Sequence, residues 1–351
     1  MDTTPSGIEM ARQSGRQRLM CCAPNRLGIL VALLAVALAM GPGFVAAQDA
    51  EMEHSVIAPL ASKSLMLDAV ALDDRLVAVG ERGHILISKD GGASWQQIEV
   101  PTRAMLTGMA FVSNDVGVAV GHDSVILRTT DAGETWDLVF SAPEDEAPFF
   151  DVWFADADNG VAIGAYGSHH RTTDGGLTWD FEPIGDTDWH LHEIARADNG
   201  KLYMAAEAGF AYRSDDDGAT WTELPTPYEG SYFGVLPLEG DALLLFGLRG
   251  HLYRSEDAGE TWQELDTGTV AMLTNGVKLT DGTIVIVGLG GTVLASTDGG
   301  QTFSYSQQAG RRGISAVVET SDGSLLLVGE FGIRTATIAE LTTVADRGGD
   351  D

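Results

Sequence analysis

An all-β fold, a seven-bladed β-propeller of four-stranded antiparallel blades, is predicted by a short motif that recurs at nearly constant spacing. The motif Ser/Thr-x-Asp-x-Gly-x-Ser/Thr-aromatic occurs at residues 88–95, 129–136, 172–179, 214–221, 255–262 and 296–303. A small residue ends an apolar run eight residues before each copy, at Gly80, Gly121, Gly164, Ala206, Gly247 and Gly288. Gly329 continues this series, although its Asp motif is missing. Successive small residues lie 41 to 43 residues apart, so the chain contains seven repeats of blade length.

Each repeat contains four short apolar runs separated by turn residues. In the first repeat we expect strands at residues 65–72, 76–79, 84–87 and 95–100. Asp73 and Asp74 mark the first turn, residues 81–83 the second, and the Asp motif the third. Runs this short, bounded by Gly and Asp, favour β-hairpins over helices. The part of the chain after residue 47 shows no sustained helical period.

The seventh repeat ends after residues 333–338 and is one strand short. Because an open ring would expose unpaired backbone groups, we expect residues 54–58 to form an N-terminal strand that pairs with the last blade and closes the ring. The predicted organisation is a secretion signal at residues 1–47, an N-terminal segment with the closing strand at 48–61, the propeller at 62–341 and a flexible acidic tail at 342–351.

The recurring motif resembles the Asp box of bacterial sialidase-type repeats, in which it is structural. Its carboxylate can accept hydrogen bonds from backbone N–H groups of its own turn, and its aromatic residue can pack beneath that turn. Six equivalent turns on a ring lie too far apart to converge on one substrate, so a catalytic or calcium-binding role is disfavoured. The motif residues are Asp90, Asp131, Asp174, Asp216, Asp257 and Asp298, with Trp95, Trp136, Trp179, Trp221, Trp262 and Phe303.

The N-terminus has the pattern of a secretion signal. Four arginines precede an apolar stretch at residues 27–40, which is short for a transmembrane helix, and Val45-Ala46-Ala47 provides a small-residue cleavage site. We therefore expect export to the periplasm with no direct membrane insertion after cleavage. An uncleaved membrane anchor that faces the periplasm is the alternative.

The mature chain is strongly acidic and lacks cysteine. The signal holds four of the 21 basic and two of the 51 acidic residues, which leaves 17 basic and 49 acidic residues and a net charge of −32. This charge argues against nucleic acid or an anionic membrane surface as a partner. Without cysteine, an exported protein depends on packing rather than on disulfides. We expect a monomer.

No arrangement of residues that would support catalysis stands out. The arginine-containing signature of sialidases is missing, and Tyr212 and Tyr253 occupy equivalent repeat positions, which favours packing roles. His190 and His192 share one face of a strand, but no third ligand lies at metal-binding spacing. We therefore expect no enzyme activity, no cofactor and no metal. A carbohydrate-active propeller, as a sialidase-like glycosidase or a lectin, is the alternative.

One face of the predicted propeller carries arginines. The turns between second and third strands share this face with the loops between blades. The arginines on these elements are Arg82, Arg103, Arg249, Arg311 and Arg312. Arginine on an acidic molecule suits recognition of carboxylates or of an acidic protein segment. The alternative is that each arginine pairs with a nearby acidic residue.

Residues 75–86, Arg-Leu-Val-Ala-Val-Gly-Glu-Arg-Gly-His-Ile-Leu, followed by the Asp motif, resemble the photosystem II assembly and stability factor family. The pattern recurs at residues 287–294, and the resemblance covers residues 62–338. Members of that family are lumenal seven-bladed propellers of chloroplasts and cyanobacteria.

The resemblance implies a non-catalytic, exported assembly factor, related to photosynthesis, that holds a membrane-protein subunit or another exported protein segment. It also implies an arginine patch for partner contact, for which Arg82, Arg103, Arg249, Arg311 and Arg312 are the candidates. Service to an inner-membrane transporter is a further alternative.

Overall fold

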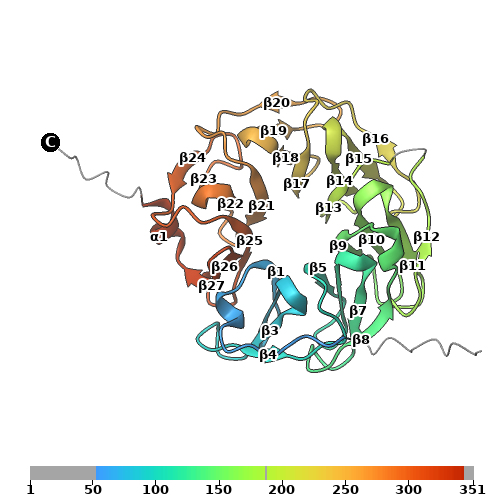
Figure 1. Ribbon diagram of the computed structural model, residues 1–351. Coiled ribbons are helices and arrows are strands. Elements are labelled where there is room, and N and C mark those ends of the chain that lie inside the picture. Colours follow the sequence, from blue (N-terminus) through green and yellow to red (C-terminus); the bar gives the residue numbers. More distant parts are fainter. Residues whose placement is uncertain (1–52, 186–187, 344–351) are drawn as a thin grey trace, which may run out of the picture. The chain divides into compact units, whose positions relative to one another are not determined.

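A ring of seven antiparallel sheets is formed by residues 53–185 and 188–343, the residues that the computed structural model describes (Figure 1). Six sheets have four strands and the last has three. The seven-bladed propeller predicted from the repeat is therefore confirmed. The predicted signal at 1–47 and most of the predicted acidic tail, residues 344–351, lie outside the described residues.

The first strand of each blade lines the axis of the ring (Figure 1). These strands are β1 (Met66–Ala71), β5 (Leu106–Phe111), β9 (Phe149–Phe154), β13 (Leu191–Arg196), β17 (Tyr232–Pro237), β21 (Leu273–Lys278) and β25 (Ile314–Glu319). We number the blades 1 to 7 in this order. The first strand of each blade contacts that of the next blade, and β25 contacts β1 to complete the ring.

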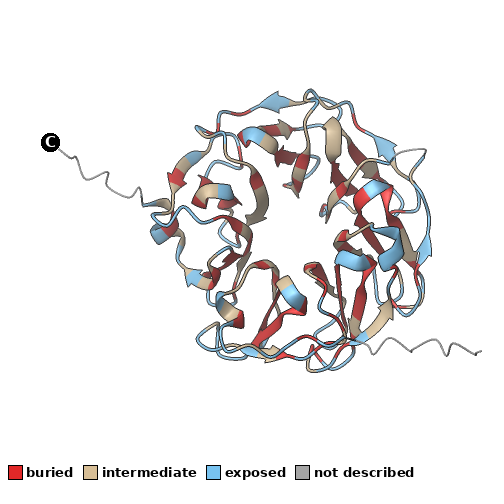
Figure 2. Ribbon diagram, in the orientation of Figure 1, coloured by how far each residue is buried: buried red, intermediate tan, exposed pale blue. Residues whose placement is uncertain are grey.

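The second strands are β2 (Leu76–Gly80), β6 (Gly117–Gly121), β10 (Gly160–Gly164), β14 (Leu202–Ala206), β18 (Leu243–Gly247), β22 (Ile284–Gly288) and β26 (Leu325–Gly329). All of their residues are buried (Figure 2). Neighbouring blades cover both faces of each second strand, and this explains why its sequence is apolar throughout rather than alternating. The glycine at its end permits close backbone contact, since a Cβ on Gly121 would lie 2.1 Å from the Met105 carbonyl oxygen.

Short outer strands and turns complete the blades. The third strands are β3 (Ile85–Ser88), β7 (Ile126–Thr129), β11 (His169–Thr172), β15 (Ala211–Ser214), β19 (Leu252–Ser255), β23 (Thr292–Ser296) and β27 (Gly332–Ala336). The fourth strands are β4 (Gln96–Ile98), β8 (Asp137–Phe140), β12 (Asp180–Phe181), β16 (Thr222–Glu223), β20 (Gln263–Glu264) and β24 (Ser304–Gln307). The one α-helix of the described residues is α1 (Ile338–Thr342), and the 3-10 helices η1 (Ala61–Lys63) and η4 (Pro143–Asp145) lie in connections.

The prediction that residues 54–58 close the ring as a strand of the last blade is wrong. Ser55 N–H instead donates to the Val100 carbonyl at 2.8 Å, and the Gln97 side chain holds the backbone of Val56 and Ala58. These bonds fix the segment beside β4, and the last blade keeps three strands. The ring closes without a shared strand because blades 1 and 7 bury apolar side chains against each other, with Leu86 and Leu326 in one cluster.

The six Asp motifs share one hydrogen-bond pattern. One carboxylate oxygen accepts from the backbone N–H four residues on, at 2.8–3.0 Å, and the other accepts from the hydroxyl of the same residue, at 2.5–2.7 Å. The first Ser/Thr of the motif also donates to the carboxylate and accepts from the glycine N–H. Hydrogen bonds from Ser94 lower the pKa of Asp90 to about 2. Each carboxylate is therefore ionised and occupied by its own turn.

Buried carboxylates connect neighbouring blades at the axis. The first strand of each blade forms an edge of its sheet, so alternate amides of this strand face the axis without a partner strand. Asp68 accepts from two such amides, Ala69 in its own blade at 2.8 Å and Met109 in blade 2 at 2.9 Å. Asp151 likewise accepts from Val152 and from Ile194 in blade 4, both at 2.8 Å. These acids thus satisfy backbone groups that the ladder leaves unpaired.

The same burial raises the pKa values of these acids. Removal from water, with a smaller contribution from Asp151, raises the pKa of Asp68 to about 7. Burial raises the pKa of Asp151 to about 6 and places that of Glu193 well above its ordinary value. Asp68 and Asp151 therefore titrate near neutral pH.

We predict that Asp216→Ala destabilises the protein and that Asp215→Ala does not. Asp216 accepts three hydrogen bonds within its turn, from Ser214 and from the N–H and hydroxyl of Thr220, whereas Asp215 forms only an exposed ion pair with Arg213. The expected loss in free energy of unfolding is about 1–2 kcal/mol for Asp216→Ala and about 0.5 kcal/mol or less for Asp215→Ala. Urea unfolding followed by tryptophan fluorescence measures both, and equal losses would contradict the structural role of the motif.

The free energy of unfolding should fall as pH rises from 5 to 8, and Asp68→Asn should flatten this dependence. Between the ordinary pKa of 3.8 and about 7, folded Asp68 holds a proton that the unfolded chain has released. This contribution is complete below the unfolded pKa and is lost as pH rises through the folded pKa. Between pH 5 and 8, the free energy of unfolding should fall by about 1–3 kcal/mol more in the unmodified protein than in Asp68→Asn. Identical slopes in urea titrations at pH 5 and 8 would refute it.

Candidate partner-binding site

One face of the ring, called here the loop face, consists of the turns between second and third strands and the loops between blades. Six of these turns are 3-10 helices: η2 (Glu81–Gly83), η3 (His122–Ser124), η5 (Ala165–Gly167), η6 (Glu207–Gly209), η7 (Leu248–Gly250) and η8 (Leu289–Gly291). A Cβ on Gly83 would lie 2.3 Å from the Thr102 carbonyl oxygen, and one on Gly250 equally close to that of Thr269. Each of these two turns therefore rests on the loop to the next blade.

The middle residue of each turn has a left-handed backbone, with φ between 54° and 66°. These residues are Arg82, Asp123, Tyr166, Ala208, Arg249 and Gly290. All but Ala208 and Gly290, which are partly buried, are exposed. The side chain at this position makes no contribution to the turn's hydrogen bonds, so it is available for contact with a partner.

All five predicted arginines are exposed on this face. Arg82 and Arg249 are middle residues of η2 and η7. Arg311 and Arg312 lie in the loop from blade 6 to blade 7, where the Arg311 Cα is 3.3 Å from the position of a Cβ on Gly291. Arg103 lies in the loop from blade 1 to blade 2. The arginines therefore occupy separate blades rather than one pocket.

Arg103 differs from the other four because it has partners. Its Nε donates to the His54 carbonyl at 2.8 Å, and its guanidinium lies 3.5 Å from the Glu53 carboxylate. Within residues 53–185 and 188–343, no side-chain hydrogen bond or ion pair engages Arg82, Arg249, Arg311 or Arg312. Arginines elsewhere are paired, for example Arg75 with Asp74 and Arg213 with Glu260. Four positive charges are thus left without a neutralising group on this face.

Exposed apolar side chains lie among these arginines and were not predicted from the sequence. Val270, in the loop that supports η7, is 85% exposed, and Leu289, the first residue of η8, is 41% exposed. Val270 follows Thr269, whose carbonyl contacts the turn of Arg249, and Leu289 shares η8 with the glycine beside Arg311. Blades 5 to 7 therefore present alternating basic and apolar groups. The only sequence signal was position, because both residues fall in segments that belong to the loop face.

A row of aromatic rings crosses from the loop face of blade 3 towards the axis. Tyr166 contacts His190 edge-on at 5.0 Å between ring centroids, and Phe150 lies 5.9 Å from His190 and 5.6 Å from His192. Phe233 continues the row at 4.6 Å from His192. Burial lowers the pKa of His192 to about 4, so this imidazole is neutral at physiological pH.

The two histidines of this row do not form a metal centre with other groups in the structure. Their rings are 6.2 Å apart. Across the described residues, no cluster of three or more His, Cys, Asp and Glu side chains is arranged to hold a metal ion. Within the same residues no helix is long and apolar enough to cross a membrane.

One family model matches most of the ring. Residues 88–149 and 139–332 match the model described as Photosynthesis system II assembly factor YCF48, and together these ranges cover more than half of the chain. The chain belongs to this family. The resemblance predicted from residues 75–86 and 287–294 is therefore confirmed.

A curated relative shares part of the sequence. Photosystem II stability/assembly factor HCF136 from Arabidopsis thaliana chloroplasts is 28% identical over 115 residues. The alignment covers 30% of this chain and 28% of that protein, so the chain matches little more than a quarter of the relative's length.

Solved structures show the same fold at low identity. YCF48 bound to D1 peptide has a TM-score of 0.65 and 20% identity over 81% of this chain and 95% of its own. YCF48 from Cyanidioschyzon merolae gives 0.64 and 16%, over 80% and 98%. Streptogramin B lyase gives 0.67 and 15%, over 81% and 96%. Since this last neighbour is an enzyme, the fold alone does not decide between binding and catalysis. Family membership is consistent with a non-catalytic assembly or stability role.

Proposed function

We propose that the protein is a non-catalytic assembly factor whose loop face holds an extended segment of a membrane-protein subunit. The observation that carries this proposal is the set of four exposed, unpaired arginines, Arg82, Arg249, Arg311 and Arg312, on one face of an otherwise acidic chain. Guanidinium groups bind carboxylates with two parallel hydrogen bonds, and exposed Val270 and Leu289 add apolar contacts. The partner segment should therefore combine acidic and apolar residues.

The contact at Arg103 provides an internal example of such binding. There, an extended segment of this chain gives a main-chain carbonyl from His54 and a carboxylate from Glu53 to one exposed arginine. A relative in the same family has been solved with a D1 peptide bound. The contact at Arg103 supports an extended acidic segment as the ligand of the remaining arginines, and the solved relative supports a peptide as that ligand.

We predict that Arg311→Glu/Arg312→Glu weakens binding of a fluorescent D1 peptide by tenfold or more, equivalent to about 1.4 kcal/mol. The reversed charges would repel carboxylates of the peptide, and binding to the unmodified chain should weaken with added salt. Fluorescence anisotropy with the full chain measures both effects.

The matched control is Lys89→Glu/Arg196→Glu, which changes the net charge equally but lies at the opposite face. Lys89 is within an Asp motif, and Arg196 pairs with Asp217 in another. This variant should retain peptide affinity within about twofold, because the altered charges lie beyond the screening length. Equal losses in the two variants, or none in the first, would refute the loop face as the binding site.

Export is part of the same proposal. The basic and apolar pattern of residues 1–47 supports a cleaved signal, and a periplasmic location would bring the monomeric propeller to the segments that membrane proteins expose there. N-terminal sequencing of the protein purified from its source cells tests this, with Gln48 expected as the first residue. A chain that retains Leu27–Met40 would instead be an anchored protein.

A further inference from the structure

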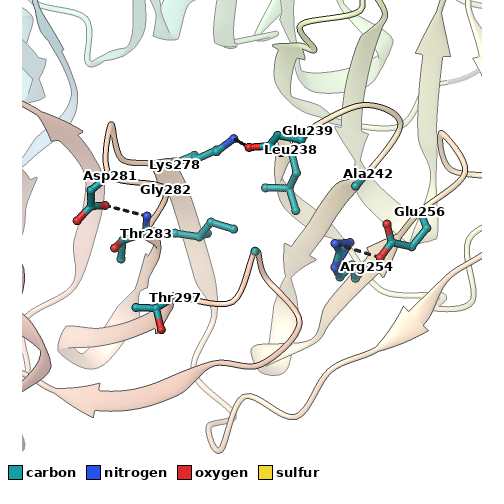
Figure 3. Close-up of a pocket in the computed structure, with 12 residues that line it drawn as sticks. Leu238, Glu239, Ala242, Arg254, Glu256, Lys278, Asp281, Gly282, Thr283 and Thr297 are labelled. Atoms are coloured by element: carbon teal, nitrogen blue, oxygen red, sulfur yellow. Dashed lines mark hydrogen bonds and ion pairs between the residues drawn. The ribbon is translucent and has the colours of Figure 1, made fainter.

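The face opposite the loop face, called here the Asp-box face, has a cleft of about 490 Å³ between blades 5 and 6 (Figure 3). Blade 5 contributes Glu239, Arg254 and Glu256 to its wall, and blade 6 contributes Lys278 and Asp281. Figure 3 shows two ion pairs at its border, Lys278 with Glu239 at 3.1 Å and Arg254 with Glu256 at 3.0 Å. This volume lies in the usual range of about 300–1,000 Å³ for ligand sites.

Comparison of the repeats shows which contacts are missing at this seam, the boundary between blades 5 and 6. The residue before the first Ser/Thr of the Asp motif is an arginine in blades 2, 3, 4 and 5. Arg171 of blade 3 pairs with Glu182 of its own blade. Arg128 donates to the Gly175 carbonyl of the next blade at 2.7 Å, and Arg213 to the Ala258 carbonyl of the next blade at 3.0 Å. Each bond ties one blade to the Asp motif of the next.

Arg254 occupies the same repeat position in blade 5 but forms no such hydrogen bond to blade 6. Its equivalent target is the carbonyl of Gly299 in blade 6, and no hydrogen bond joins the two groups among the described residues. Gly299 instead forms part of the cleft wall. The cleft therefore lies where the arginines of blades 2 and 4 would donate a hydrogen bond to the next blade.

A second hydrogen bond between blades 5 and 6 is missing near the axis of the ring. Gly234 occupies the repeat position at which Asp68, Asp151 and Glu193 accept a hydrogen bond from a backbone N–H of the next blade. A Cβ on Gly234 would lie 2.1 Å from the ring of Phe246, so this ring excludes any side chain there. Within the described residues, the ion pair of Lys278 and Glu239 is the polar side-chain contact that remains across the seam.

The guanidinium of Arg254 has hydrogen-bond donors to spare. Its side chain is 11% exposed, and its Nε and Nη1 are buried without an acceptor in the described residues. Its one carboxylate partner, Glu256, is 71% exposed and can turn towards water. Buried donors without acceptors are unfavourable, so a small rotation of the guanidinium towards an acceptor in the cleft would satisfy them.

The charges of the cleft select the kind of acceptor. Arg254 and Lys278 face three carboxylates, those of Glu239, Glu256 and Asp281, so a free anion would meet a surplus of negative charge. Two of the three equivalents in other blades, Arg128 and Arg213, bind main-chain carbonyls of the next blade, whereas Arg171 pairs with a carboxylate of its own blade. A neutral main-chain carbonyl is therefore the acceptor that we expect at Arg254.

The shape of the site favours a chain over a compact molecule. A second hollow of about 440 Å³ shares Arg254 and Glu256 with the first and continues past Trp262 and Leu265 of blade 5. We propose that this groove binds an extended polypeptide segment, which places a main-chain carbonyl on Arg254 and lysine or arginine side chains beside Glu256 and Asp281. The protein would then hold an acidic segment on its loop face and a basic segment on its Asp-box face.

Two blocked pentapeptides test the site on the full chain by NMR, acetyl-Thr-Lys-Thr-Lys-Thr-amide and its counterpart with glutamate in place of lysine. The lysine peptide should shift the signals of the Trp262 indole N–H, the Gly299 amide and the Arg254 Nε–H. Arg254→Gln should weaken this binding by tenfold or more. Glu256→Gln, which leaves the guanidinium in place, should weaken it severalfold.

Arg213→Gln is the matched control, because this guanidinium already holds the Ala258 carbonyl. This variant should unfold at a lower temperature and bind the lysine peptide with unchanged affinity. Three results would overturn the proposal: equal or tighter binding of the glutamate peptide, unchanged shifts in Arg254→Gln, or NMR evidence that Arg254 bonds to Gly299 in the free protein. None of them bears on the arginines of the loop face.

Discussion

Burial of the second strand on both faces is the constraint on which the rest of the structure depends. An apolar strand such as Ile284–Gly288 cannot face water on either side, so each blade requires a neighbour on both sides. Only a closed ring supplies two neighbours to all seven blades. Blades 1 and 7 therefore pack through Leu86 and Leu326 like any other pair, and no shared strand is needed to join them.

Polar groups at the axis must be satisfied within this apolar arrangement. The first strand of each blade has an unpaired edge at the axis, and acids such as Asp68 and Asp151 accept from one amide in their own blade and one in the next. Where Ala316 has no acceptor to offer blade 1, Asp68 accepts from Ala69 itself. Gly234 offers none to blade 6, and no side chain of that blade replaces it in the described part of the chain. Between blades 5 and 6, both the axial hydrogen bond and the arginine–carbonyl bond of the Asp-box face are therefore missing within the described residues.

The sequence predicted the elements that repeat and missed those that occur once. Gly80 and its equivalents recur because the same backbone contact recurs in each blade, so period alone located the strands and the turns that carry Arg82 and Arg249. The path of residues 54–58 depends instead on the side chain of Gln97, about 40 residues away and without an equivalent in other blades. The exposure of Val270 and Leu289 is equally singular, since apolar residues in this chain are mostly core residues.

The two faces of the ring use their turns in opposite ways, and this difference explains where binding can occur. In an Asp-motif turn, side chains make the turn: the Asp298 carboxylate is occupied by Ser296 and Thr302 and has little capacity for a ligand. In a loop-face turn, a left-handed backbone makes the turn, and the middle side chain, such as Arg249, remains free. Binding on the Asp-box face therefore needs a residue outside the motif whose usual bond is absent. Arg254 meets that condition, because it forms no hydrogen bond with the Gly299 carbonyl of blade 6, the equivalent of the carbonyls that Arg128 and Arg213 bind.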